Sequence, residues 1–493
     1  MKTQISRRDF LKLAGFASAA TTLWGCAPEA AALLPTVFTP VPVTQDEHFL
    51  FGALKRITYG PTVGEFERAK QIGFEAFVEE QLAFEQIDDA GLSSRISHLT
   101  TLEMPAFELA ALEKRGQPVT ELIQATLLRA IYSRRQLYEQ MVNFWSDHFN
   151  IYVLKSQDRF LKPVDDREVI RPHALGKFRD LLSASMHSPA MMVYLDNASS
   201  TKDGPNENYA RELMELHTLG VSGGYSQEDV HEVARALTGW IVTGRRGGGE
   251  PGEFVFRDTL HDDAAKKILG VDFPAGQGVR DGEQLIGLLA DHPSTAGYIA
   301  YKLVRHFVSD DPPVGLVSKT SATFQASGGD IREVLRTIFF SEEFRRSLGL
   351  KLKRPFEYVV SALRQTDAET TTDKGVTSML RAMGQLPFFW PAPNGYPDVG
   401  AAWLNSNDLL TRWNFSLALA VNSLKDVTVD WKGIAPSSTV DEILNELSVK
   451  FFGNALAEES RTSILDIINS VDSVEPSVSA GALLLASPYF QNR

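Results

Sequence analysis

The sequence predicts a mainly α-helical protein, a multi-helix globular domain with one small inserted β-hairpin. Apolar residues recur at steps of three and four along most of the chain, which is the spacing of an amphipathic helix. Residues 243–270 depart from this spacing, because a glycine-rich stretch is followed there by two short runs of strand-forming residues. With 493 residues, 43% of them hydrophobic, the chain can bury a large core. We therefore predict a single large domain over residues 46–493.

The first 25 residues predict a twin-arginine signal peptide that ends in a lipobox. Arg7 and Arg8 stand in the pattern S-R-R-x-F-L-K, and an apolar run follows at residues 11–24. That run is too short to cross a bilayer, whose core requires about 20 residues. The segment ending at Cys26 resembles a lipobox, so Cys26 is the predicted lipidation site. Residues 26–45, rich in proline and alanine, would then tether a periplasmic or cell-surface lipoprotein to a membrane.

The helices are predicted from their apolar stripes and their first residues. Residues 121–145 keep the helical spacing for about six turns, which predicts one long helix. Ser226 and Asp229 form a capping-box pair that opens another helix. Further helices are predicted to begin near Pro293, Asp330, Pro355 and Asn407. Residues 253–257 and 266–269 are the two expected strands, and they are predicted to pair with each other as the hairpin.

Composition excludes several classes of function. Cys26 is the only cysteine in the sequence, and lipidation would leave the folded body without a thiol. Disulfides, thiolate nucleophiles and iron–sulfur clusters are therefore excluded from that body. A divalent metal, if one is bound, must be held by oxygen or nitrogen ligands. The formal net charge of −13 argues against nucleic acid as a partner.

Residues 206–220 contain the main candidate site. If residues 208–219 are helical, four polar side chains fall within an arc of about 100°: Asn208, Arg211, Glu212 and Glu215. Glu212 and Glu215 are then suited to bind a hard cation or to act as an acid and base pair. The alternative is a solvated stripe in which Arg211 and Glu215 form an ion pair at i,i+4 spacing.

The same helical geometry predicts what faces inward from this segment. Tyr209, Leu213 and Leu216 form the expected apolar face. His217 points about 140° away from Glu212 at 100° per residue, so it is not expected to join the two glutamates.

Two further histidines are candidates for metal ligands or general bases. His148 follows an aspartate at the end of an aromatic segment, and His261 precedes two aspartates in the expected hairpin region. Each of these histidines has packing or a turn as its alternative. Trp145, Trp240 and Trp390 are candidates for lining a sugar-binding cleft.

Several of these segments together resemble the bacterial family named domain of unknown function 1800. The matching segments, called the family segments below, are Arg56–Pro61, Asn143–Phe149, Asn206–Gly220, Ala236–Trp240, His261 with Lys267–Gly270, Lys353–Glu357 and Pro393–Tyr396. The resemblance extends from about His48 to Phe490. It implies an exported, mainly helical protein whose activity is not established.

The resemblance also implies a partner and strengthens the candidate site. Members of the family are often encoded beside a second exported family, domain of unknown function 1501, whose fold is similar to sulfatases and alkaline phosphatases. A co-exported sulfatase-like protein is therefore an expected partner. The family segments include Asn208, Glu212, Glu215, His148 and His261, which favours one shared polar site.

Two hypotheses of function follow. The first is a metal-assisted hydrolase acting on an extracytoplasmic polysaccharide or lipid. Its expected catalytic residues are Glu212, Glu215 and His148, its metal ligands are the same three with His261, and its substrate-binding residues are Asn208, Arg211, Trp145 and Trp240. The second is a non-catalytic protein that binds or assembles with the sulfatase-like partner.

Overall fold

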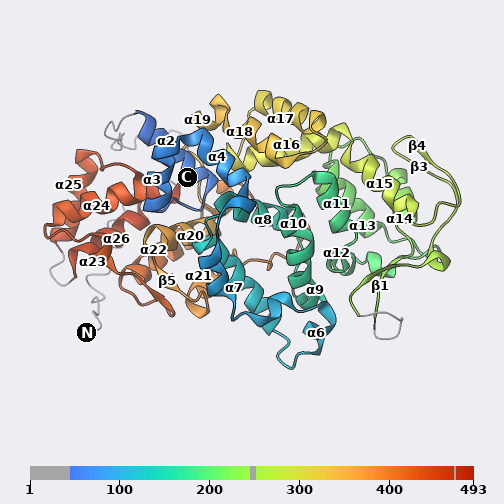
Figure 1. Ribbon diagram of the computed structural model, residues 1–493, viewed down its shortest axis with the longest axis horizontal. Coiled ribbons are helices and arrows are strands. Elements are labelled where there is room, and N and C mark those ends of the chain that lie inside the picture. Colours follow the sequence, from blue (N-terminus) through green and yellow to red (C-terminus); the bar gives the residue numbers. More distant parts are fainter. Residues whose placement is uncertain (1–44, 245–250, 471–473) are drawn as a thin grey trace. The chain divides into compact units, whose positions relative to one another are not determined.

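A computed structural model describes residues 45–244, 251–470 and 474–493, and it is mainly helical, as predicted (Figure 1). The predicted signal peptide and lipidation site, with Arg7, Arg8 and Cys26, lie outside the described residues. The chain forms two compact units. The first contains the described part of Met1–Phe77 with Ser347–Gln385 and Val399–Arg493, and the second contains Val78–Arg346 and Leu386–Asp398. The single domain predicted over residues 46–493 stays a prediction.

The first unit is built from helices and one minimal strand pair. Its elements are α2 (Gln45–Ile57), α3 (Val63–Ile72), α20 (Pro355–Gln365), β5 (Glu369–Thr370), α21 (Lys374–Ala382), η8 (Gly400–Trp403), α22 (Ser406–Ala420), β6 (Val427–Thr428), α23 (Trp431–Ile434), α24 (Val440–Phe452), α25 (Glu458–Asn469), α26 (Pro476–Ala486) and α27 (Pro488–Gln491). The antiparallel strands β5 and β6 pair with each other. Helix α20 is buried along its whole length.

The second unit begins within α4 (Phe74–Leu82), which continues from the first. Its elements up to the hairpins are η2 (Phe84–Gln86), α5 (Ala90–Ile96), η3 (Thr100–Glu103), α6 (Ala106–Ala111), α7 (Gln117–Tyr132), α8 (Gln136–His148), α9 (Asp158–Asp165), η4 (Asp166–Ile170), α10 (Arg171–His173), α11 (Phe178–Met186), α12 (Pro189–Tyr194), η5 (Asn197–Ser199), α13 (Glu207–Glu212), η6 (Leu213–Thr218) and α14 (Gln227–Ala236). The remaining elements are β1 (Trp240–Val242), β2 (Phe254–Phe256), η7 (Asp258–Leu260), β3 (Lys266–Ile268), β4 (Val271–Phe273), α15 (Arg280–Ala290), α16 (Pro293–Phe307), α17 (Val314–Ala326), α18 (Ile331–Phe339) and α19 (Glu342–Arg346).

The prediction of one helix over residues 121–145 is wrong, because the segment forms two helices, α7 and α8. The chain is extended at Ser133, where α7 ends. Asp89 holds this break, since its carboxylate accepts hydrogen bonds from the Ser133 hydroxyl at 2.7 Å and from the Arg134 amide at 2.9 Å. The apolar spacing continues through the break, so periodicity alone did not reveal it.

Helix starts were predicted well where a capping residue marks them. Ser226 and Asp229 form the expected capping box at the start of α14. The helices predicted near Pro293, Asp330, Pro355 and Asn407 are α16, α18, α20 and α22. A cap depends on a few neighbouring residues, which is why sequence locates it.

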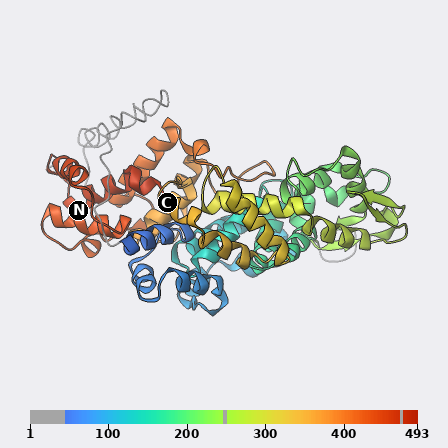
Figure 2. The ribbon, with the colours of Figure 1, turned by 90° about the horizontal axis from the view of Figure 1, so that it is seen from above.

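The two predicted strands exist, but they do not pair with each other. The strand at Phe254–Phe256 pairs with Trp240–Val242, and the strand at Lys266–Ile268 pairs with Val271–Phe273. Both pairs are antiparallel, so this region contains two small hairpins instead of one. Figures 1 and 2 show the hairpins at one end of the second unit, away from α8.

The family segments of the first unit serve packing and ion pairing. Gly60 has a φ of +107° and lies so close to α20 that an added Cβ would be 2.7 Å from the Ser361 hydroxyl. Its carbonyl accepts a hydrogen bond from Arg364 Nε at 2.9 Å. Buried Glu357 pairs with Arg354 and Arg493, each at 3.1 Å. These contacts join distant parts of the chain within the first unit.

No helix of residues 45–244, 251–470 or 474–493 has both the length and the apolar character needed to cross a bilayer.

Candidate functional site

The segment with the two glutamates changes helix type in the middle. Helix α13 ends at Glu212 and continues as η6, a π-helical turn over Leu213–Thr218. The Thr218 hydroxyl donates to the Leu213 carbonyl at 2.7 Å, and the next amide, that of Leu219, donates to the Met214 carbonyl at 2.8 Å. Such π turns within α-helices are frequent at functional sites.

The wider turn changes which residues face the interior. His217 and Thr218 are fully buried, whereas Leu216 is only partly buried. Leu216 was predicted to face inward with Tyr209 and Leu213, and this was wrong for Leu216, whereas the direction of His217 away from Glu212 stays a prediction. The prediction used 100° per residue, and a π turn advances by less than that for each residue.

Glu212 is the last residue of α13 and Glu215 lies within the π turn that follows, and both are partly buried. Burial raises the pKa of Glu212, the negative charge of Glu215 raises it further, and Arg211 lowers it. The alternative prediction of an Arg211–Glu215 ion pair is wrong. Arg211 instead contacts Glu207 Oε2 at 3.4 Å and Gln227 Oε1 at 2.9 Å. The glutamate pair is therefore not neutralised by the arginine on its own helix.

Three tyrosines lie around the glutamate pair. Burial raises the pKa of Tyr225 and that of Tyr298, the latter to about 12, and the charge of Glu215 raises both. Burial also raises the pKa of Tyr194, with a smaller contribution from Glu212. All three phenols therefore keep their protons at neutral pH and are hydrogen-bond donors near the carboxyl groups.

His148, at the end of α8, is buried and held at both ring nitrogens. Lys302 Nζ on α16 donates to Nδ1 at 2.8 Å, and Nε2 lies 3.0 Å from the His217 carbonyl, to which it donates. This arrangement requires the neutral tautomer protonated at Nε2. The pKa of His148 lies well below its usual value because of burial, and the positive charge of Lys302 lowers it further. Neither nitrogen is available to a metal, contrary to the prediction.

His217 was not among the predicted site residues. Its ring is fully buried, and neither ring nitrogen has a hydrogen-bond partner within the described chain. Burial lowers the pKa of His217 to about 3, and Lys302 contributes to this shift. The rings of His217 and His148 are 6.0 Å apart. Buried polar atoms without partners are uncommon and often mark functional positions.

The loop Leu386–Asp398 is fixed against this cluster by hydrogen bonds. Asn150 Nδ2 donates to the carbonyls of Trp390 at 3.0 Å and Ala392 at 2.7 Å. The Tyr194 hydroxyl donates to the Pro391 carbonyl at 2.8 Å. Trp390, carried by this loop, is partly exposed.

Asp158 is a further unusual carboxyl group near Tyr194. It is fully buried, and neither carboxyl oxygen has a hydrogen-bond partner in the described structure. Burial raises the pKa of Asp158 to about 8, with a further contribution from Asp165. Asp165 itself is paired, because it accepts hydrogen bonds from Lys162 and Ser188, each at 2.6 Å. No sequence pattern indicated Asp158 as a site residue.

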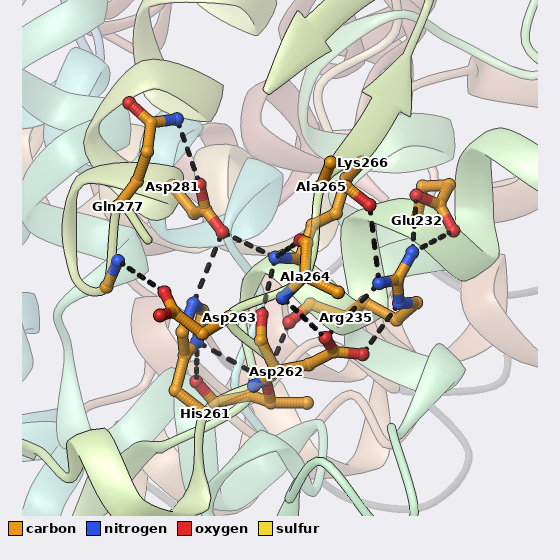
Figure 3. Close-up of polar contacts among 12 residues, drawn as sticks. Glu232, Arg235, His261, Asp262, Asp263, Ala264, Ala265, Lys266, Gln277 and Asp281 are labelled. Atoms are coloured by element: carbon orange, nitrogen blue, oxygen red, sulfur yellow. Dashed lines mark hydrogen bonds and ion pairs between the residues drawn. The ribbon is translucent and has the colours of Figure 1, made fainter. Parts of the chain in front are cut away.

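His261 belongs to a different polar cluster, in the hairpin region (Figure 3). Its Nδ1 donates to the Thr238 carbonyl at 2.8 Å, and its Nε2 lies 3.2 Å from Asp281 Oδ2. Lys266 Nζ contacts the same carboxylate at 2.6 Å. Asp262, beside His261, pairs with Arg235. The expectation that His261 joins His148 and the glutamates is therefore wrong, because its ring is committed to linking the hairpins to α15.

The tryptophan and asparagine side chains predicted to bind substrate differ in their exposure to solvent. Trp145 and Trp240 are fully buried, and the Trp145 indole donates to the Ala174 carbonyl at 2.9 Å. Both are core residues, so their predicted role in lining a cleft is wrong. Asn208 is exposed on the same helix as Glu212, and its side chain donates to the Leu195 carbonyl at 3.2 Å.

The predicted metal ligands do not assemble into a metal site. Glu212 and Glu215 lie at the junction of α13 and the π turn, but His148 is held at both nitrogens and His261 lies in the other cluster. No group of three or more His, Cys, Asp or Glu side chains within the described ranges is arranged to hold a metal ion.

The structure thus defines a mainly helical protein whose polar site joins α8, the π turn, α16 and the loop Leu386–Asp398. Three of the family segments, around His148, Glu212 and Gly395, meet there. A family model described as "Protein of unknown function (DUF1800)" matches residues 52–492, so the chain belongs to the DUF1800 family. No curated protein and no solved structure matches the chain.

Proposed function

We propose that the protein is a hydrolase in which Glu212 and Glu215 form an acid and base pair that cleaves glycosidic bonds. The observation that carries the proposal is the partly buried carboxyl pair at the junction of α13 and the π turn, in which burial and Glu215 raise the pKa of Glu212. Pairs of carboxyl groups with different proton affinities are the usual machinery of glycoside hydrolysis.

The roles of the two residues follow from their surroundings. Glu212, with the raised pKa, is the general acid that protonates the leaving oxygen. Glu215 supplies the carboxylate that activates water or attacks the sugar carbon. Tyr225 and Tyr298 are protonated donors near Glu215 and would orient the hydroxyl groups of a sugar. Trp390, partly exposed on the adjacent loop, offers an indole face for stacking.

Glu212→Gln is expected to lower hydrolytic activity at least about 100-fold, because glutamine cannot donate the proton. The same change should stabilise the protein slightly, by less than about 1 kcal/mol, since it relieves repulsion with Glu215 at a partly exposed site. Hydrolysis of a panel of polysaccharides and urea unfolding would measure both effects. Glu228→Gln, at an exposed position on α14, is the matched control and should change neither.

The hydrolase proposal is overturned if the wild-type protein hydrolyses no member of the panel and forms a tight complex with a co-encoded sulfatase-like protein. The non-catalytic alternative would then replace the enzyme, with Glu212 and Glu215 as part of a binding surface.

We also propose that the protein is exported by the twin-arginine pathway and anchored by lipid on Cys26. Replacing Arg7 and Arg8 together by lysine should leave the precursor in the cytoplasm, because the pathway recognises the paired guanidinium groups. Cys26→Ala should leave the protein exported but extractable without detergent. Cell fractionation would test both variants. Normal export of the lysine variant, or membrane retention of Cys26→Ala, would contradict the corresponding assignment.

A further inference from the structure

Two positively charged side chains on α16 lie in the site without a counter-ion. Lys302 and Arg305 are both partly buried, and neither forms an ion pair with any carboxylate of the described residues. Lys302 Nζ has its hydrogen bond to the neutral ring of His148. Arg305 donates to the Tyr301 hydroxyl, and its Nε is buried without a hydrogen-bond partner among the described residues. Partly buried cations normally pair with an acid, so this pair is unusual.

The surroundings of the two cations are polar and aromatic. The Lys302 ammonium lies 5.6 Å from the centre of the Tyr298 ring, and the Arg305 guanidinium lies 4.5 Å from that of Tyr301. Each cation is therefore held by a tyrosine one turn earlier on α16.

The two aspartates that act on Lys302 do not form an ion pair with it. Asp147 and Asp398 act on Lys302 only at longer range. Asp398 accepts a hydrogen bond from His306 Nδ1 at 2.9 Å. Burial and Arg305 together lower the pKa of Lys302 to about 8, against the opposing effect of these two aspartates.

We infer that Lys302 and Arg305 bind an anionic group of the substrate, so that the polymer cleaved is an acidic polysaccharide carrying carboxylate or sulfate groups. The inference rests on the proposed function, because it takes Glu212 and Glu215 as the place where the glycosidic bond is cleaved. Tyr298 connects the two parts of the site, because Glu215 raises its pKa while Lys302 lies over its ring. An acidic sugar would place its glycosidic oxygen at the glutamates and its anionic group at α16.

This arrangement also explains why neither cation has a carboxylate partner among the described residues. A carboxylate or sulfate bound between Lys302 and Arg305 would supply the missing charge and accept hydrogen bonds from both. A neutral sugar would leave both cations uncompensated, so the two cations select against neutral polymers.

Isothermal titration calorimetry of the full mature chain would test the inference. The probes are oligogalacturonate for the carboxylate, sulfated dextran oligomers for the sulfate, and neutral dextran oligomers of equal length. We expect at least one acidic probe to bind 10-fold or more tightly than neutral dextran, with an affinity that falls as salt rises. Lys302→Gln and Arg305→Gln should each weaken that binding by about 10-fold.

Two control variants distinguish the loss of a positive charge in the site from a loss of folding. Lys319→Gln, at an exposed position on α17, removes the same charge and should not change the affinity. Lys302→Arg keeps the charge and should retain most of the binding, even if Lys302→Gln is poorly folded. The inference is overturned if the acidic probes bind no more tightly than neutral dextran, or if Lys319→Gln weakens binding as much as Lys302→Gln.

Binding and cleavage are separate readouts. If an acidic probe binds through Lys302 but is not hydrolysed, the binding site stands and the proposed hydrolase fails. If a neutral polymer is hydrolysed and the acidic probes do not bind, the hydrolase stands and the anionic substrate is rejected.

Discussion

Asp158→Asn is expected to become more stabilising as pH rises, with a gain of about 4 kcal/mol relative to wild type between pH 5 and pH 8. The carboxyl group of Asp158 is fully buried with no hydrogen-bond partner in the described structure, and burial raises its pKa from 3.8 to about 8. In this pH range the unfolded chain is ionised at Asp158 while the folded protein keeps the proton. Each pH unit therefore removes about 1.4 kcal/mol from the stability of the wild-type protein.

Asparagine does not titrate, so the variant avoids this loss. The difference between the two proteins should be small near pH 4, should grow through neutral pH and should level off above about pH 8. Urea unfolding of wild type and variant at a series of pH values would measure it.

Asp165→Asn, on the same helix, is the matched control and should have the opposite effect. Asp165 pairs with buried Lys162 and accepts from Ser188, so its neutralisation leaves a buried ammonium without a partner, at a cost of about 3 to 5 kcal/mol. A pH-independent difference between Asp158→Asn and wild type would show that Asp158 is ionised in the folded protein.

Features that depend on neighbouring residues were predictable from sequence. The capping box of α14 and the starts of α16, α18, α20 and α22 are local, and the structure confirms them. The predicted strand segments also exist. Their pairing was not predictable, because a strand of three residues carries too little pattern to select its partner.

Of the candidate site, helical spacing indicated only that Glu212 and Glu215 lie on one face of their segment. The remainder depends on long-range contacts and on one backbone irregularity. Lys302 reaches His148 across 154 residues of sequence, and no motif joins them. His217 was not among the predicted site residues, because a regular α-helix directs it away from Glu212. His261 was included because it occurs in a family segment, although membership of a segment says nothing about distance in space.

Gly395→Ala is expected to destabilise the protein by about 3 to 5 kcal/mol and to separate the loop Leu386–Asp398 from α8. Gly395 has a φ of +70°, and a Cβ added there would lie 2.1 Å from the Asp147 carbonyl oxygen. The left-handed backbone alone costs an alanine about 1 to 2 kcal/mol. The overlap with a backbone atom adds more, because neither the loop nor the end of α8 can relieve it by a change of rotamer.

Gly276→Ala isolates the backbone part of this cost. Gly276 has a φ of +84° with nothing within 4 Å of the added Cβ, so its substitution should cost only about 1 to 2 kcal/mol. Urea unfolding would compare the two variants, and hydrogen exchange of the Val153 amide, which donates to the Phe388 carbonyl at 3.2 Å, would report release of the loop. Equal costs for the two variants, with Val153 still protected, would show that the loop does not rest on Asp147. Because this loop carries Trp390 and closes over Tyr194, its release should also abolish binding of any sugar at the glutamate pair.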